Sequence, residues 1–95
     1  MAKISLSEAK ILVAKWSKGT FPTIAQSIKY HFSRHSKEVS AEDVWKYLRK
    51  AEAFERNLRG ARTSMLKNDV TRLMKNGYYI IKDKAGKIIS FGLER

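Results

Sequence analysis

The hydrophobic period of this 95-residue chain changes near residue 61, and that change limits the folds open to it. Before residue 61, apolar residues recur at the three- and four-residue spacing of amphipathic helices; after it, short β-prone runs alternate with turn residues. Asn76-Gly77 separates two of these runs, as in a two-residue hairpin. The pattern predicts an α+β fold, with N-terminal helices packed on a C-terminal antiparallel sheet.

Capping and stop signals predict three helices, over about 6–18, 21–35 and 41–58. The expected caps are Ser5 for the first helix, Thr20 or Thr23 for the second and Ser40 for the third. Gly60 lies beyond the end of the third helix, where the sheet region begins.

Three strands are expected over about 70–75, 78–82 and 87–93, and a fourth if residues 63–67 pair with them. A chain of 95 residues can bury one hydrophobic core but not two. A single domain over residues 1–95 is therefore expected.

Charge points to a polyanionic partner. Twenty Lys and Arg against nine Asp and Glu give a net charge of +11, and nucleic acid, an acidic protein and an anionic membrane surface are the candidates. Residues 1–37 carry seven cations and one acid, residues 38–55 three and five, and residues 56–95 ten and three. The polyanion is thus expected to meet the second helix and the sheet, not the third helix.

Several kinds of protein are not expected. No apolar run approaches the roughly 20 residues that cross a bilayer, and no secretory signal follows Met1. The chain has no cysteine, so disulfides and thiolate nucleophiles are absent. The carboxylates are scattered and no third ligand accompanies the histidines, so no metal or other cofactor is expected.

The two histidines, His31 and His35, lie four residues apart in the second predicted helix. At about 100° per residue both fall at or beside its apolar stripe, so they border the core if the helix persists that far. Imidazole exchanges a proton near neutral pH, which makes both candidates for acid–base catalysis. A packed, hydrogen-bonded histidine with no catalytic function is the alternative for each.

Ser90 is a hydroxyl within a final strand that otherwise consists of core-type residues. Strict alternation puts Ile88 and Gly92 on the same face as Ser90, while Ile89 and Phe91 take the opposite face. Packing of the second helix over this sheet would let Ser90 approach the end of that helix.

Cleavage of RNA needs no more than this chain offers. The neighbouring 2′-hydroxyl can serve as the nucleophile, so the protein has only to move protons and stabilise the added charge of the phosphorane. A histidine, a second proton carrier and Lys or Arg on the phosphate are sufficient for that reaction.

Five blocks of sequence, in this order, resemble a known family: residues 16–21, 27–35, 47–54, 75–79 and 87–92. They are similar to the C-terminal ribonuclease toxin domains of bacterial polymorphic and contact-dependent toxins, including colicin D and related small ribonucleases. The resemblance covers about residues 16–93 and implies helices joined to an antiparallel sheet.

The resemblance also implies roles for individual residues. His35, preceded by Arg34, takes the place of the family's catalytic histidine, and Ser90, beside Phe91, takes the place of its serine. His31 would then be an auxiliary acid, base or phosphate ligand. The chain departs from the family pattern where Ser36 stands in place of the glycine that commonly follows the histidine.

The family also implies a substrate, an inhibitor and a location. Such toxins often cut tRNA, and an acidic cognate immunity protein covers the basic cleft in the producing cell. The domain would be secreted or delivered as the C-terminal part of a larger toxin and would act, as a monomer, in the cytoplasm of the target cell.

A larger set of basic and aromatic residues on the second helix and the sheet is expected to contact RNA. These residues are Lys29, Arg34, Arg59, Arg62, Arg72, Lys75, Tyr79, Lys87 and Phe91. The alternatives are a solvated basic face for the cations and ordinary sheet packing for Tyr79.

Two rival functions remain open. A winged-helix DNA-binding regulator also has three helices followed by a β-hairpin, but its recognition helix should be short and basic, whereas the third helix here carries Glu42, Asp43, Glu52 and Glu55. A basic module that binds an acidic protein without catalysis would explain the charge but not the histidine pair.

Overall fold

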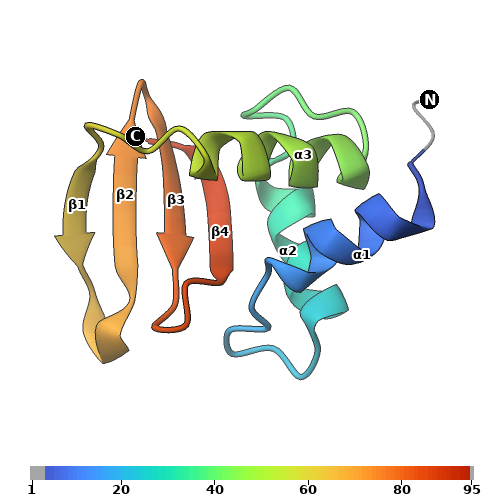
Figure 1. Cartoon of the computed structure of the whole chain (residues 1–95), viewed down its shortest axis with the longest axis horizontal. Helices are drawn as coiled ribbons and strands as arrows, with labels where there is room; N and C mark the ends of the chain where they lie inside the picture. The colour runs from blue at the N-terminus through green and yellow to red at the C-terminus, as the bar shows by residue number, and fades with distance from the viewer. Residues whose placement is uncertain (1–3, 95) are drawn as a thin grey trace.

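The computed structural model describes residues 4–94 and contains three helices followed by a four-stranded antiparallel sheet (Figure 1). The elements are α1 (Leu6–Ala14), α2 (Ile24–His35), α3 (Val44–Glu55), β1 (Arg62–Met65), the 3-10 turn η1 (Lys67–Asp69), β2 (Thr71–Lys75), β3 (Tyr78–Lys82) and β4 (Ile88–Leu93). The strand order β1-β2-β3-β4 is a simple meander. The α+β fold expected from the sequence is confirmed, and the sheet has the fourth strand.

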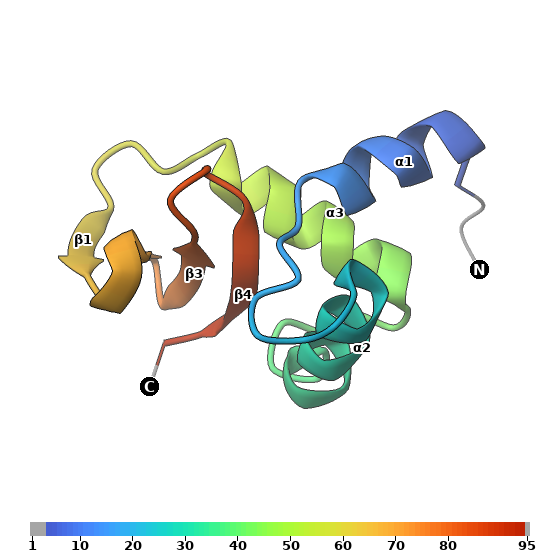
Figure 2. The same cartoon turned by 90° about the horizontal axis from the view of Figure 1, so that it is seen from below.

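All three helices are shorter than their apolar patterns suggest. α1 ends at Ala14 because the chain beyond it runs alongside the sheet, where Trp16 forms a parallel bridge with Ile88 (Figure 2). Ser17 N–H donates to the carbonyl of Ile88, whose own N–H donates to the carbonyl of Lys15. These contacts with a distant strand replace the last helical turn that local sequence favours.

The helix caps follow the expected chemistry at two of the three positions. The side chains of Ser5 and Thr23 accept the backbone N–H three residues later, at the starts of α1 and α2. The cap of α3 is Asp43, which accepts from Lys46 N–H, whereas Ser40 lies in the preceding turn with φ of 57°. The prediction of Ser40 as the cap is therefore wrong by three residues.

The helices gather at the β4 side of the sheet, and β1 forms the opposite edge (Figures 1 and 2). The core lies at this junction, where Tyr47 and Leu48 of α3 and Ile88 and Phe91 of β4 are fully or almost fully buried. The Tyr47 hydroxyl donates to the carbonyl of Phe91. Burial raises the pKa of Tyr47, so this hydroxyl keeps its proton.

An irregularity in β4 changes which side chains share a face. Ile81 pairs with Ser90 but Lys82 pairs with Ile88, so Ile89 is an extra residue in β4. Ile88 therefore turns into the core rather than sharing the face of Ser90, which corrects the strict alternation expected from the sequence. Tyr79 pairs with Gly92, so Gly92 stays on the face of Ser90 as expected.

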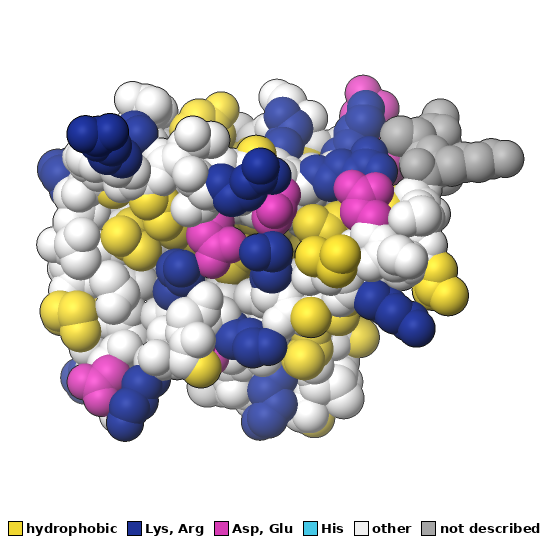
Figure 3. Space-filling model, viewed as in Figure 1, with side chains coloured by type: hydrophobic (Ala, Val, Ile, Leu, Met, Phe, Trp, Pro, Cys, Tyr) yellow, Lys and Arg dark blue, Asp and Glu magenta, His cyan; other side chains and the backbone are white. Residues whose placement is uncertain are grey.

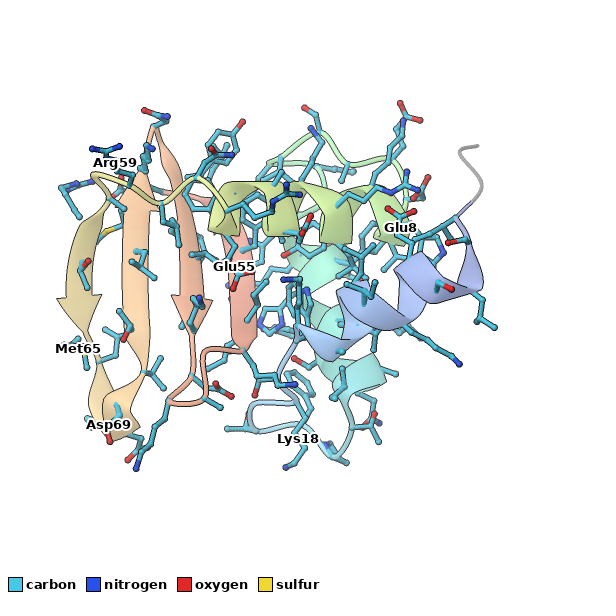
Figure 4. All side chains as sticks on the ribbon, in the orientation of Figure 1. Glu8, Lys18, Glu55, Arg59, Met65 and Asp69 are labelled. Carbon is cyan, nitrogen blue, oxygen red and sulfur yellow. The ribbon has the colours of Figure 1, made fainter. Side chains whose placement is uncertain are left out.

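Three acids in and beside α3, Glu42, Glu52 and Glu55, are held in ion pairs. Glu55 lies between α3 and the strands (Figure 4) and bonds both Lys15 and Lys82, at 3.7 and 2.9 Å. Glu8 of α1 forms a bidentate ion pair with Arg49. The face that carries α3 accordingly shows acidic side chains next to basic ones (Figure 3).

Tyr47→Phe should lower the free energy of unfolding by about 1–3 kcal/mol, because it removes a buried hydrogen bond between α3 and β4. Denaturant unfolding followed by circular dichroism measures this. Tyr30→Phe is the matched control, since Tyr30 is 46% exposed, and it should change stability by less than about 0.5 kcal/mol. Equal effects of the two substitutions would contradict the role given to Tyr47.

Candidate active site

A cleft of about 500 Å³ opens between the C-terminal end of α2 and the sheet. It is named here the arginine cleft, and its lining residues are Arg34, His35, Glu38, Arg72, Tyr79, Ile81 and Leu93. Tyr79 and Ile81 alternate along β3 with Tyr78 and Ile80, and Tyr78 packs against Phe54 of α3. The cleft therefore lies on the sheet face opposite α3, and no histidine is visible on the α3 face (Figure 3).

A chain of hydrogen bonds joins His35 to Ser90. The Nε2 atom of His35 lies 3.3 Å from the Tyr79 hydroxyl, which lies 3.0 Å from the Ser90 hydroxyl. The sequence allowed His35 and Ser90 to approach each other if the second helix packed over the sheet. The structure brings them together with the Tyr79 hydroxyl between them.

Glu38 orients the imidazole. Its Oε1 atom lies 3.1 Å from Nδ1 of His35 and accepts the backbone N–H of Leu93 at 3.2 Å. A carboxylate accepts hydrogen bonds, so Nδ1 carries the proton of the neutral ring and Nε2 presents a lone pair to Tyr79. The hydroxyls of Ser90 and Tyr79 can then donate in series toward His35.

Gly92 makes this arrangement possible. A Cβ at residue 92 would lie 2.9 Å from Glu38 Oε1, 3.0 Å from His35 Nδ1 and 3.0 Å from a ring carbon of Tyr79. Any larger residue would push these groups apart. The end of α2 can approach β4 this closely only because residue 92 has no side chain.

Two arginines that form no ion pair with any of the described residues flank the cleft. The guanidinium of Arg72 lies 4.9 Å from the centre of the Tyr79 ring, and its Nε atom is buried with no hydrogen-bond partner. Arg34 donates to the Tyr30 hydroxyl at 3.4 Å. Within residues 4–94, neither arginine has an ion pair, in contrast to Arg49. Their charge is free to bind an anion such as phosphate.

His31 lies behind His35 and not on the cleft. The two rings are nearly parallel, with centres 6.2 Å apart, and Nδ1 of His31 donates to the carbonyl of Ser27 at 2.8 Å. Burial lowers the pKa of His31, and the nearby charges of His35 and Arg34 act in the same direction, against the hydrogen bond to Ser27. The ring is therefore neutral at pH 7.

Arg34, Arg72 and Tyr79 are the members of the expected RNA-contacting set that line the cleft. Lys29 lies elsewhere on α2, beside Phe32 and other apolar residues. Phe91 is 2% exposed within the core, which corrects its assignment as an RNA contact.

The remaining predicted contacts lie away from the cleft. Arg62 pairs with Glu94 at 2.7 Å, and the amino groups of Lys75 and Lys87 donate to the carbonyls of Asn57 and Ala14. Arg59 is exposed on the connection from α3 to β1 (Figure 4). Arg59, Arg62 and Lys87 are exposed and Lys75 is half-buried, and none of the four lines the cleft.

Glu38 is the site residue that the sequence analysis missed. It follows His35 by three residues, a spacing that places an acid beside a histidine where the helical path continues. That spacing alone could have identified Glu38 as a partner of His35, but Glu38 is also one of five acids between residues 38 and 55, which together form one acidic region of the sequence. Only the tertiary structure shows that Glu38 lies beside His35 and apart from the ion pairs of α3.

Comparison with known proteins adds no family. No protein-family model, curated protein or solved structure matches the chain. Within residues 4–94, no three His, Asp or Glu side chains cluster in a way that could hold a metal ion. In the same part of the chain, no helix has the length and apolar character needed to span a membrane.

Gly92→Ala should displace His35 and Glu38, because the added methyl group would lie closer to both than ordinary contact allows. We expect the ring resonances of His35 to move in NMR spectra and its contact with Tyr79 to weaken. The resonances of His31, which is held by Ser27, serve as the internal control. An unmoved His35 in a folded Gly92→Ala variant would contradict this account of the glycine.

The lowered pKa of His31 predicts a dependence of stability on pH. Below about pH 6.5 the unfolded chain binds a proton that the folded chain resists, so stability is full above that pH and falls as the pH drops toward the folded-state pKa. His31→Gln removes this group and leaves His35 and Arg34 in place. Unfolding free energies measured at about pH 7.5 and 5.5 should fall less in the variant than in the wild type. Equal losses would contradict the prediction.

Proposed function

We propose that this domain is a metal-independent endoribonuclease toxin that cleaves RNA by attack of the 2′-hydroxyl on the adjacent phosphodiester. The observation that carries the proposal is the hydrogen-bonded series from Ser90 through Tyr79 to His35, at a cleft flanked by two arginines that form no ion pair within residues 4–94. The resemblance to colicin D-like domains, which rests on the sequence blocks around His35 and Ser90, supports the same reaction and favours tRNA as the substrate.

The cleft offers a group for each step. His35 Nε2 takes the proton of the 2′-hydroxyl as the bond from O2′ to phosphorus forms. Arg34 and Arg72 stabilise the charge added to the phosphoryl oxygens. The bond from phosphorus to O5′ then breaks as the Tyr79 hydroxyl gives its proton to O5′, and His35 returns to Tyr79 the proton that it took from the 2′-hydroxyl. The products are a 2′,3′-cyclic phosphate and a 5′-hydroxyl.

Three further residues hold this machinery in place. Glu38 fixes the tautomer of His35 and stabilises the imidazolium that forms when the ring takes a proton. Ser90, 5% exposed, anchors the Tyr79 hydroxyl rather than acting as a nucleophile. His31 supports the ring of His35 from behind and takes no proton in this scheme.

The rival functions draw less support from the fold. α3 buries Tyr47, Leu48 and Ala51 in the core, and its cations are interspersed with acids such as Glu52 and Glu55, so it offers a mixed rather than a basic face to a DNA groove. A passive acidic-protein binder needs no oriented imidazole. The net charge of +11 is nevertheless suited to an acidic immunity protein that would cover the cleft until delivery of the toxin to a target cell.

Incubation of the purified chain with total RNA and EDTA tests the proposal. We expect cleavage to persist and the new ends to be 2′,3′-cyclic phosphates. His35→Ala should lower the cleavage rate about 100- to 10,000-fold, the usual contribution of a general acid or base. Lys29→Ala, on the same helix but outside the cleft, is the matched control and should cleave like the wild type.

Three outcomes would overturn parts of this proposal. Undiminished cleavage by His35→Ala would place the site elsewhere. Loss of cleavage in EDTA would exclude the metal-independent route. Sequence-specific binding of duplex DNA without any cleavage of RNA would replace the function with that of a DNA-binding regulator.

A further inference from the structure

A second hollow, of about 420 Å³, lies beside the arginine cleft. It is named here the aromatic hollow, and its lining residues are Gly19, Thr20, Phe21, Tyr30, His31 and Ile89. Among residues 4–94 no Lys, Arg, Asp or Glu lines it, whereas the cleft has two arginines and a glutamate. The two spaces therefore differ in the chemistry they can receive.

The same helix lines both spaces, and two contacts connect them. Arg34 of the cleft donates to the hydroxyl of Tyr30, which lines the hollow. The ring of His31, in the hollow, is nearly parallel to that of His35 in the cleft. The two residues of each pair are four positions apart, about 6 Å along the helix axis, a distance that a single nucleotide can span.

The hollow contains a cluster of aromatic rings, one of which is exposed. Phe21 and Tyr30 have ring centres 5.1 Å apart, and Tyr30 meets His31 edge to face at 5.1 Å. Tyr30 is 46% exposed, a large aromatic surface left in contact with water beside a cationic cleft. Proteins that bind single-stranded RNA stack unpaired bases on such rings.

His31 adds a polar edge to this hollow. Its Nδ1–H is donated to the carbonyl of Ser27, so in the neutral ring Nε2 is the nitrogen with a lone pair. That atom can accept a hydrogen bond from an N–H group of a base. The Ser27 contact and the parallel His35 ring hold the imidazole in one orientation.

We propose that the aromatic hollow binds a nucleobase of the RNA whose phosphate occupies the arginine cleft, with Tyr30 and Phe21 as the stacking surface. This inference rests on the proposed function, because it assigns the substrate's base to a position beside the scissile phosphate. The domain would then prefer unpaired RNA, since a base in a duplex has to break its base pair and its stacking to enter the hollow.

Binding of an uncleavable dinucleotide tests the inference. The probe is the 2′-deoxy dinucleotide d(ApA), compared with its two analogues that lack one base or the other. For the wild type, removal of one of the two bases should weaken binding about 5- to 100-fold, as expected for the loss of one base–aromatic stack. Titrations followed by NMR measure the affinities and show whether Phe21 and His31 resonances respond to that base.

Variants of Tyr30 separate stacking from other effects. Tyr30→Ala should bind d(ApA) with the same affinity as the base-lacking analogue that the wild type binds more weakly. Tyr30→Phe, which retains the ring but not the hydroxyl, should keep the difference in affinity between these two probes. Tyr30 is exposed, so both variants are expected to fold, and circular dichroism checks this. A wild type that binds all three probes equally, or a Tyr30→Ala variant that keeps the base preference, overturns the inference.

The outcome is distinguishable from failure of the proposed function because the probe is never cleaved. If the chain cuts no RNA but shows a base preference that depends on Tyr30, the hollow is a base site and the ribonuclease proposal fails. If the chain cuts RNA in a manner sensitive to His35 but shows no such preference, the hollow alone is rejected.

Discussion

The structure depends on the attachment of α3 to β4 around Phe91. Its ring contacts those of Tyr47, Phe54 and Tyr78, with centres 5.7 to 6.1 Å apart, and its carbonyl accepts the Tyr47 hydroxyl. Burial of one such ring contributes about 1.5–3 kcal/mol to the free energy of unfolding. The buried hydrogen bond fixes where β4 lies against α3 as well as how closely the two elements pack. Because β4 is held on one face by α3, its other face is presented to α2 in a constant orientation.

That second face is where the candidate site forms. Ser90 and Gly92 lie there, two residues apart. Ser90 provides a hydroxyl, whereas Gly92, which has no side chain, leaves room for the end of α2. Glu38 then bonds both the His35 ring and the backbone of β4 at Leu93, so a single carboxylate ties the helix end to the strand. The imidazole is oriented before any ligand arrives, which is what acid–base chemistry requires of a site.

The distribution of charge is more informative than its total. Much of the acidic charge around α3 is matched by nearby cations, including Lys15, Arg49 and Lys82. Arg34 and Arg72, which flank the cleft, form no ion pair with a carboxylate within residues 4–94. An anionic ligand would therefore displace no carboxylate from these two arginines, and this supports the assignment of the cleft to phosphate.

The sequence by itself determined the features that arise from local preference. The change of period near residue 61, the caps at Ser5 and Thr23 and the Asn76-Gly77 turn each act over a few residues, so they predicted the order of helices and strands correctly. The histidine and the serine could also be proposed from their types and positions. Their environment could not, because it comes from residues that are distant along the chain.

Only the tertiary structure decided where the helices end and how the site is assembled. The bridge from Trp16 to Ile88 shortens α1, and the extra residue Ile89 turns Ile88 into the core, through pairings that no local pattern contains. In the same way, Tyr79 comes to lie between His35 and Ser90 only when β3 pairs with β4 and α2 packs against them. The physical reason is that hydrogen bonds and side-chain contacts between remote segments outweigh preferences worth less than about 1 kcal/mol per residue.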